Sequence, residues 1–317
     1  MRDSLVVIFL VLFVSGPLPA HGRGRDRSGN RQQVERTVAA SPQVVVSACV
    51  ISGNVTARGW DRNEVHARVS DGVQIDLTRI DQTKSQPATE LKLTAGSSRG
   101  SSCLPFGDIE LDLPRNASLK LQTNNGDIQV TEVARVTASS QAGSTKLTKV
   151  RDEANVNTIG GEISVRDSTG SFKLHTVGGS VDARDLGGAA AGDTFEASTI
   201  GGDIRLERIR HQRLRVNTVS GEVDYAGPLS RGGRYNFQSI SGRLHLTLPA
   251  DSSFRLSGTL GAGGDLRSDF NLSSPEKDTL GGAAPSGPMR RLDGTVGSGD
   301  ASITVSFFSG SIQIRKQ

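Results

Sequence analysis

The stretch ASTIGGDIRLERI, residues 197–209, predicts the fold because related forms of it occur through the middle of the chain. Related stretches are VNTIGGEISVRDS from Val156, LHTVGGSVDARDL from Leu174 and VNTVSGEVDYAGP from Val216. Each alternates apolar and polar residues, passes through a glycine turn and alternates again, as two short strands joined by a turn do. Repetition of such a unit is typical of stacked supersecondary units.

The turn glycine fixes the register of these units. Seven of them lie 17 to 23 residues apart, at Gly126, Gly143, Gly161, Gly179, Gly202, Gly221 and Gly242. Phe195 and Ala197 fall on one face of the strand before the fifth of these turns, and Ile204 and Leu206 on one face of the strand after it. One such hairpin is marginal in water, whereas stacked units bury a continuous apolar column. We therefore predict an all-β fold, a single-stranded β-solenoid built from strand–turn–strand units of 17–23 residues.

A hydroxyl-bearing residue precedes the turn in most units, in phase with the inward residues. These residues are Thr123, Thr158, Thr176, Thr199, Thr218 and Ser239. We predict a hydroxyl ladder in which each side chain bonds backbone groups of the turn or its neighbour in the next unit. The glycines three residues later, Gly126, Gly161, Gly179, Gly202, Gly221 and Gly242, supply positive φ or room for the next coil. Both roles are architectural.

Acidic residues follow several of the glycines and would form an outward column. They are Asp127, Glu162, Asp203 and Glu222. Such a column could bind calcium or cationic ligands, or it could be solvated turn chemistry. Ser144, Ser180 and Arg243 interrupt it, and no Gly-Gly-x-Gly-x-Asp repeat is present, so the second interpretation is favoured.

The rest of the chain predicts an exported protein. Residues 1–20 contain the apolar run Leu5 to Val14 and form a signal peptide, with an uncleaved anchor as the alternative. Residues 21–40 form a basic flexible linker, in which five arginines between Arg23 and Arg36 face two acids; it either tethers the chain to anionic polymers or is only a spacer. No later apolar segment approaches 20 residues, so we predict no transmembrane domain after signal cleavage.

Residues 41–317 form the predicted solenoid domain. We divide it into an irregular opening region (41–120), regular coils (121–270), a loop (273–293) and closing strands (294–317). Cys49 and Cys103 are the two cysteines, and export favours a disulfide between them, with two buried thiols as the alternative. Two isolated cysteines cannot complete a metal site, and we predict no cofactor.

No catalytic motif stands out. The five histidines contain no metal-spaced pair, and the chain has no Gly-x-Ser-x-Gly, Walker or His-Glu-x-x-His motif. The enzymatic alternative is a carbohydrate-active β-helix enzyme with acids such as Asp182, Asp185 and Asp224 along a groove. Nothing in the sequence brings such a carboxylate pair together with a basic partner. We therefore predict that the protein is not an enzyme.

Longer segments resemble a known family. They are SGNVTARGWDRNEV (52–65), LPRNASLKLQTNNGDIQV (113–130), GGRYNFQSISGRLHLTLPADSSF (232–254) and SFFSGSIQIRK (306–316). With the repeated turns, they resemble bacterial exported β-strand-repeat proteins of the "putative adhesin" family, a domain of unknown function. The resemblance implies a β-solenoid in the cell envelope or outside the cell, and some relatives are linked to envelope-stress signalling. It carries over no catalytic residue.

We therefore predict an exported, non-enzymatic protein that acts as an adhesin-like binding or scaffolding surface in the bacterial cell envelope. Its location would be periplasmic, cell-surface or extracellular. A partner or sensor in envelope-stress signalling is the main alternative. The expected partner is an envelope protein or a surface polymer, and not nucleic acid. Uncapped edge strands would also permit self-association through the ends of the stack.

Overall fold

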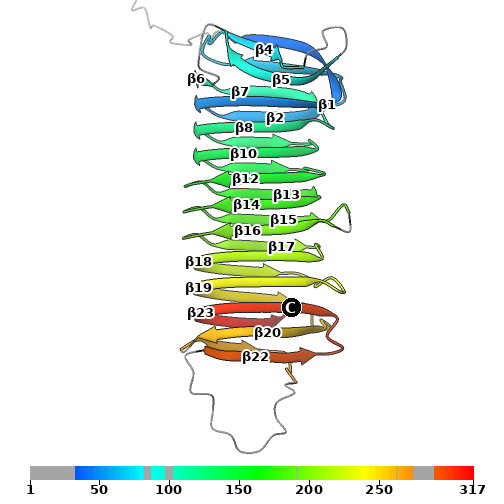
Figure 1. Cartoon of the computed structure of the whole chain (residues 1–317), viewed down its shortest axis with the longest axis vertical. Coiled ribbons are helices and arrows are strands. Elements are labelled where there is room, and N and C mark those ends of the chain that lie inside the picture. The colour runs from blue at the N-terminus through cyan, green and yellow to red at the C-terminus, as the bar shows by residue number, and fades with distance from the viewer. Residues whose placement is uncertain (1–32, 82–86, 97–102, 191, 262, 274–288) are drawn as a thin grey trace, which may run out of the picture. The chain divides into compact units, whose positions relative to one another are not determined.

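The computed structural model describes residues 33–81, 87–96, 103–190, 192–261, 263–273 and 289–317. Residues 32–317 form one unit, and the fold described below is that of this unit alone. The described residues contain strands and turns and no helix, which agrees with a composition rich in glycine and β-branched residues. The predicted all-β solenoid is confirmed (Figure 1).

Twenty-three strands are present among the described residues. Before the first regular coil come β1 (Val34–Ser52), β2 (Val55–Trp60), β3 (Glu64–Val69), β4 (Ile75–Arg79), β5 (Ala88–Ala95), β6 (Leu104–Phe106) and β7 (Ile109–Pro114). The regular coils contain β8 (Ser118–Asn125), β9 (Ile128–Thr131), β10 (Arg135–Ala142), β11 (Thr145–Thr148), β12 (Glu153–Thr158), β13 (Ile163–Thr169), β14 (Ser171–Thr176), β15 (Val181–Gly187), β16 (Thr194–Thr199) and β17 (Ile204–Ile209). The remaining strands are β18 (Arg213–Ala226), β19 (Arg234–Leu248), β20 (Phe254–Gly261), β21 (Asp265–Ser268), β22 (Met289–Val296) and β23 (Ala301–Lys316).

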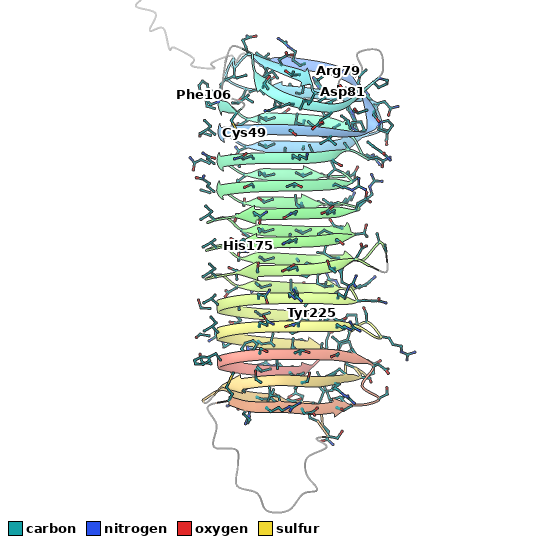
Figure 2. The ribbon with its side chains drawn as sticks, viewed as in Figure 1. Cys49, Arg79, Asp81, Phe106, His175 and Tyr225 are labelled. Atoms are coloured by element: carbon teal, nitrogen blue, oxygen red, sulfur yellow. A yellow bond between two sulfur atoms is a disulfide. The ribbon has the colours of Figure 1, made fainter. Side chains whose placement is uncertain are left out.

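Each coil contributes one strand segment to each of two faces. Face 1 has the order β4, β5, β1 (residues 45–50), β8, β10, β12, β14, β16, β18 (213–218), β19 (234–239), β23 (302–307), β20 and β22. Face 2 has the order β1 (34–39), β3, β7, β2, β9, β11, β13, β15, β17, β18 (223–226), β19 (243–248), β23 (311–316) and β21. Strands of successive coils run parallel, so equivalent residues form rows across each face, as Figure 2 shows.

The core lies between the two faces. It is filled by the alternate residues of each strand, mostly valine, leucine, isoleucine and alanine. From β14 onward the core also holds aromatic rings, and Tyr225 packs edge-on against Tyr235 and Phe237. Tyr225 Oη donates a hydrogen bond to the carbonyl oxygen of Pro228 at 2.9 Å, which satisfies its buried hydroxyl.

The order of the strands in space differs from their order in the sequence at both ends. β23 lies between β19 and the last coil, where it pairs with β20 on face 1 and with β21 on face 2. β1 and β2 likewise lie between the coil of β8 and β9 and the segments β5 and β7. The closing strands 294–317 therefore do not simply follow the regular coils at the end of the stack, because β23 is inserted one coil inward.

The outermost strand of face 1 is antiparallel to its neighbour at both ends of the stack. β4 pairs antiparallel with β5, and β22 pairs antiparallel with β20, so face 1 ends in a reversed strand on both sides. Asp81 accepts hydrogen bonds from Arg79 Nε at 3.0 Å and from the backbone nitrogen of Thr89 at 2.7 Å, which fixes the end of β4 beside β5 (Figure 2). β4 pairs with no strand other than β5 among the described residues, so the predicted self-association through the ends of the stack stays a prediction.

Two predicted boundaries also differ from the structure. β1 begins at Val34, so the linker predicted for residues 21–40 ends earlier, because Val34 to Ala39 pair with β3. The signal peptide and the rest of the linker lie outside the described residues. β22 begins at Met289, within the loop predicted for residues 273–293, because this segment pairs with β20; residues 274–288 lie outside the described part.

Candidate functional site

The repeat glycines form a column in which backbones of successive coils touch. A Cβ atom built on Gly202 would overlap the carbonyl oxygen of Gly179, and one on Gly179 would overlap that of Gly161. The same overlap with the preceding coil occurs at Gly126, Gly143, Gly161, Gly221 and Gly242. Of the two roles predicted for these glycines, close approach therefore applies at every one of them. Positive φ applies only at some, for example at Gly126, where φ is 146°.

The hydroxyl row lies inside the stack, next to these glycines. Thr199 Oγ1 donates to the carbonyl oxygen of Gly179 at 3.1 Å and accepts from the backbone nitrogen of Gly202 at 3.1 Å. It thereby bridges the turn of its own coil and that of the preceding coil. Thr158 and Thr176 lie 3.1 Å apart through their Oγ1 atoms, and Thr158 Oγ1 donates to the oxygen of Gly161 at 2.9 Å.

The row is less regular at both ends. Thr218 Oγ1 donates to the oxygen of Ser220 at 3.0 Å, within its own turn. Thr123 Oγ1 and Ser239 Oγ are buried and have no hydrogen-bond partner among the described residues. The predicted bonds to turn backbone or to the next unit are thus present for Thr158, Thr176, Thr199 and Thr218, and only the first three of these residues bond between coils.

Two of the acids after the glycines serve the turns. Asp127 Oδ1 accepts from the backbone nitrogen of Ser144 at 2.7 Å, and Asp203 Oδ1 accepts from that of Glu222 at 2.8 Å. Asn54 and Asp108 make the same kind of bond in the opening coils. Each side chain satisfies a backbone donor of the next coil, which is turn chemistry rather than a free ligand set.

The second corner of the coils was not recognised from the sequence. A residue other than glycine has positive φ there in five successive coils: Glu132, Lys149, Asp167, Asp185 and Arg208. Each lies six positions after a repeat glycine, so the spacing could have revealed the column. Opposite charges pair along this column. Lys149 Nζ lies 3.0 Å from Glu132, and Nε and Nη2 of Arg208 each donate to one carboxylate oxygen of Asp185 at 2.6 Å.

Seven arginines on face 2 are paired with acids of the same or neighbouring coils. The pairs are Arg58–Asp112, Arg68–Glu110, Arg166–Asp182, Arg184–Asp182, Arg205–Asp224, Arg243–Glu222 and Arg267–Asp265. The three acids of the enzymatic alternative all lie in such pairs, Asp185 with Arg208 at the corner. The guanidinium of Arg208 lowers the pKa of Asp185, whereas a glycosidase acid needs a raised pKa.

One cluster on face 2 has the residue types of a metal site. Nδ1 of His245 lies 3.0 Å from Glu222 Oε1 and 3.2 Å from Asp224 Oδ1. The three ligand atoms lie within 4.8 Å of one another. Arg243 binds the other oxygen of Glu222 at 2.8 Å and lowers the pKa of that carboxyl. A cation would have to compete with this arginine, so the cluster is accounted for as an ion-pair network.

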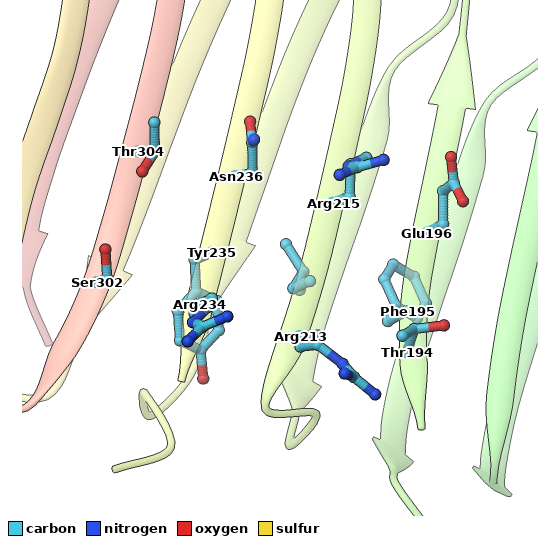
Figure 3. Close-up of a pocket in the computed structure, with 11 residues that line it drawn as sticks. Thr194, Phe195, Glu196, Arg213, Arg215, Arg234, Tyr235, Asn236, Ser302 and Thr304 are labelled. Atoms are coloured by element: carbon cyan, nitrogen blue, oxygen red, sulfur yellow. The ribbon is translucent and has the colours of Figure 1, made fainter. Parts of the chain in front are cut away.

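Face 1 has a different charge arrangement in its C-terminal half. A shallow groove of about 430 Å³ crosses the outer surface of β16, β18, β19 and β23 (Figure 3). Arg213, Arg215 and Arg234 line it against a single acid, Glu196. Arg213 donates to the carbonyl oxygen of Gly192. Among the described residues, the guanidinium groups of Arg215 and Arg234 have no hydrogen bond or ion pair, so the groove is cationic and open to an anionic ligand.

An exposed apolar residue follows the last inward residue before the turn in six successive coils; that inward residue is Thr or Ser in five coils and Phe307 in the sixth. These residues are Ile159, Val177, Ile200, Val219, Ile240 and Phe308, with exposed fractions from 37% to 66%. A second groove of about 450 Å³ lies among Val219, Ile240, Met289 and Phe308. The strand alternation places these side chains outward, since the preceding residue in each coil points into the stack.

A disulfide joins Cys49 of β1 to Cys103 before β6. It closes a loop of 54 residues in sequence separation, which on the chain-entropy account stabilises the folded chain by about 4 kcal/mol. The bond connects the inserted strand β1 to the residue before β6, and β1 and β6 are also paired as strands. It therefore fastens the irregular end of the stack.

His211 is a buried titratable group in the core. Its ring lies 5.7 Å from that of Phe172 and 5.8 Å from that of Phe195, and Nε2 lies 2.7 Å from the carbonyl oxygen of Gly170. Burial lowers the pKa of His211 below its ordinary value of 6.5, although the bond to Gly170 and the charge of Asp193 act in the opposite direction. The folded chain therefore favours the neutral imidazole.

This burial predicts that acid destabilises the fold between the unfolded pKa of His211 and its lower folded pKa. In that interval the unfolded chain binds a proton that the folded chain does not, so the free energy of unfolding falls as the pH falls, by at most about 1.4 kcal/mol per pH unit. Urea denaturation at about pH 7.5 and about pH 5.5 should show this loss. His211→Gln should flatten the pH dependence; an unchanged slope in the variant would contradict the assignment.

Among the described residues, no helix is long and apolar enough to cross a membrane. The outward residues of the faces and corners form the exposed surface of this unit. Its most distinctive part is the cationic groove of face 1, because most arginines of face 2 are already paired with acids.

Comparisons with known proteins agree with this architecture. The family model described as Toastrack DUF4097 matches residues 47–265. A solved "putative adhesin" from Parabacteroides distasonis ATCC 8503 is similar with a TM-score of 0.52 at 9% identity, covering 90% of this chain and 98% of that chain. A "putative adhesin" from Bacteroides fragilis NCTC 9343 has a TM-score of 0.44 at 12% identity, with 89% and 97% covered. A comparison with curated proteins finds no match.

The family resemblance inferred from the sequence motifs is confirmed by these findings. The first solved structure shows a shared fold at an identity too low to transfer a ligand. The family match extends from β1 into β21 and includes all the regular coils. The chain therefore belongs to the Toastrack family, DUF4097.

Proposed function

We propose that this protein is an exported, non-enzymatic β-solenoid that acts as an adhesin-like binding surface in the cell envelope. Its ligand is a surface polymer that lies along face 1, across successive strands. A parallel stack repeats similar outward positions from coil to coil, which suits an extended ligand with repeating groups.

The observation that carries this proposal is the difference between the two faces. Seven arginines of face 2 are paired with acids, whereas Arg215 and Arg234 on face 1 have no such partner among the described residues. An unpaired surface cation can bind an external anion strongly, because no internal ion pair must first be broken. Compared with face 2, face 1 is thus the better supported binding surface.

Export is supported by two features. Cys49 and Cys103 form a disulfide, which is typical of oxidising compartments. The apolar run Leu5 to Val14 has the length of the hydrophobic part of a signal peptide. The names of the similar solved structures, "putative adhesin", are consistent with a protein that works at a surface.

The test is retention of envelope material by the immobilised protein. Envelope fractions from the producing cell are passed over it before and after protease treatment, and the retained carbohydrate and protein are quantified. We expect a retained polymer that survives protease treatment and is lost when Arg215 and Arg234 are both replaced by glutamine. Retention of one protein, abolished by protease, would instead favour the envelope-stress partner, and soluble cleaved sugar would favour an enzyme.

A further inference from the structure

We propose that the groove of face 1 binds an acidic polysaccharide, whose carboxylates are held by Arg213, Arg215 and Arg234. This inference rests on the proposed function and specifies the chemical class of its ligand. The polymer runs perpendicular to the strands, so that successive acidic sugars meet successive coils (Figure 3).

The register of the strands places the arginines in rows along the stack. Arg213 of β18 is directly opposite Arg234 of β19, which is opposite Ser302 of β23, which is opposite Arg255 of β20. Neighbouring strands are about 4.8 Å apart. Arg213 and Arg234 are therefore one strand spacing apart, and Arg234 and Arg255 are two spacings apart. Arg255 also has no hydrogen bond or ion pair from its side chain among the described residues. A chain with regularly spaced anions can therefore contact several arginines at once.

Arginine is suited to this ligand. Its planar guanidinium forms two parallel hydrogen bonds to one carboxylate, and it keeps its charge at any physiological pH. Arg215 lies in a second row, opposite Asn236, and so offers a cation on the other side of the groove from Arg234. Glu196, opposite Arg215 in the preceding coil, is the only acid that lines the groove among the described residues.

The uncharged polar rows distinguish a polysaccharide from other polyanions. Beside the arginines, a row of uncharged polar residues crosses β16, β18, β19, β23 and β20; it consists of Ser198, Asn217, Gln238, Ser306 and Thr259. Hydroxyl and amide side chains both donate and accept hydrogen bonds, as sugar hydroxyls do, whereas a phosphodiester group can only accept.

Nucleic acid fits this surface less well. Single-stranded nucleic acids gain affinity by stacking bases on exposed aromatic side chains. Phe195 and Tyr235 lie beneath the groove, but both are 1% exposed and so offer no ring face. Phe106 and Phe308, which are exposed, do not line the groove. Hydroxyl groups and spaced carboxylates match the outward residues better than bases and phosphates do.

The experiment is calorimetric titration of the purified protein with three probes. The probes are polygalacturonate, its fully methyl-esterified form with the same backbone and no charge, and a single-stranded DNA of equal charge number. We expect binding of polygalacturonate and little or no binding of the other two. The double variant Arg215→Gln/Arg234→Gln should lose about tenfold or more in affinity, as expected for charge-assisted hydrogen bonds.

The matched control is Arg166→Gln/Arg205→Gln on face 2, which removes the same charge. Those two side chains are 53% and 54% exposed, so the control should fold and should bind polygalacturonate as the original protein does. Equal losses in both double variants would mean that net charge alone binds the polymer and would overturn the site. Unchanged binding in Arg215→Gln/Arg234→Gln would overturn it as well.

The probes separate failure of this inference from failure of the proposed function. If the methyl ester binds as tightly as polygalacturonate, the acidic class is wrong while a polymer-binding surface stands. If DNA binds as tightly, the surface recognises charge in general and the polysaccharide assignment is wrong. If none of the three probes binds, the acidic-sugar ligand is wrong, and retention of envelope polymer still decides the proposed function.

Discussion

Replacing Gly202 with alanine is expected to destabilise the protein by about 3 kcal/mol or more, at the upper end of the range for overpacking. The added Cβ would overlap the carbonyl oxygen of Gly179, which is backbone and cannot move aside as a flexible side chain can. The coils would have to separate locally. That separation would stretch the hydrogen bonds of Thr199 to Gly179 and to Gly202. Urea denaturation followed by circular dichroism measures the change in free energy of unfolding.

The adjacent glycine is the matched control. A Cβ on Gly201 would come no closer than 4.0 Å to the oxygen of Val177, so Gly201→Ala should change the free energy of unfolding by less than about 0.5 kcal/mol. Both substitutions remove the same backbone freedom from the unfolded chain. Similar effects at the two positions would therefore show that close approach of the coils is not what requires glycine at position 202.

Removal of β23 is expected to unfold the C-terminal coils. A chain that ends at Asp300 lacks the strand that lies between β19 and the last coil on both faces. Five of its side chains are at most 1% exposed: Ile303, Val305, Phe307, Ile312 and Ile314. Their burial contributes about 7–15 kcal/mol on transfer scales, which is comparable to the whole stability of a domain. Limited proteolysis with mass spectrometry should show new cleavage between residues 234 and 300.

A single substitution tests the same point with the strand retained. Val305→Asp places a carboxylate in the core and should destabilise strongly, whereas Ser306→Asp, one residue later and facing outward, should cost little. Supplying residues 301–317 as a separate peptide should restore protection of the truncated chain. Protection without the peptide would mean that β19 and the last coil can pair directly, and that the inserted strand is dispensable.

The repeated turn was recognisable from sequence because its physics is local. Alternation with a period of two assigns Phe195 and Ile204 to the interior whatever lies in the neighbouring coils, and both are at most 1% exposed. A residue without a side chain is needed wherever the backbones of successive coils touch. The column of glycines could therefore be predicted from their regular spacing in the sequence. The corner at Glu132, Lys149, Asp167, Asp185 and Arg208 has the same period, but it carries no common residue type and so was missed.

The candidate site could not be found in this way. Outside the segment Arg23 to Arg36 the charges of the chain nearly cancel, so composition indicates no cationic surface. Whether an arginine is free depends on which residue lies opposite it in the next coil. Arg205 pairs with Asp224, whereas Arg215 lies between Glu196 and Asn236 and forms no ion pair with Glu196, although both arginines lie in similar alternating stretches.

The sequence by itself thus determined the strands, the turns, the inward residues and the repeat that makes a solenoid, since each depends on neighbours within one coil. Only the tertiary structure decided that β1 and β23 are inserted one coil inward and that an antiparallel strand forms each edge of face 1. It also decided that unpaired arginines lie together on that face. These features depend on pairing between segments far apart in the chain, for example β1 with β8 and β20 with β23. Backbone hydrogen bonds can form in any register, and the packing of the whole stack selects one.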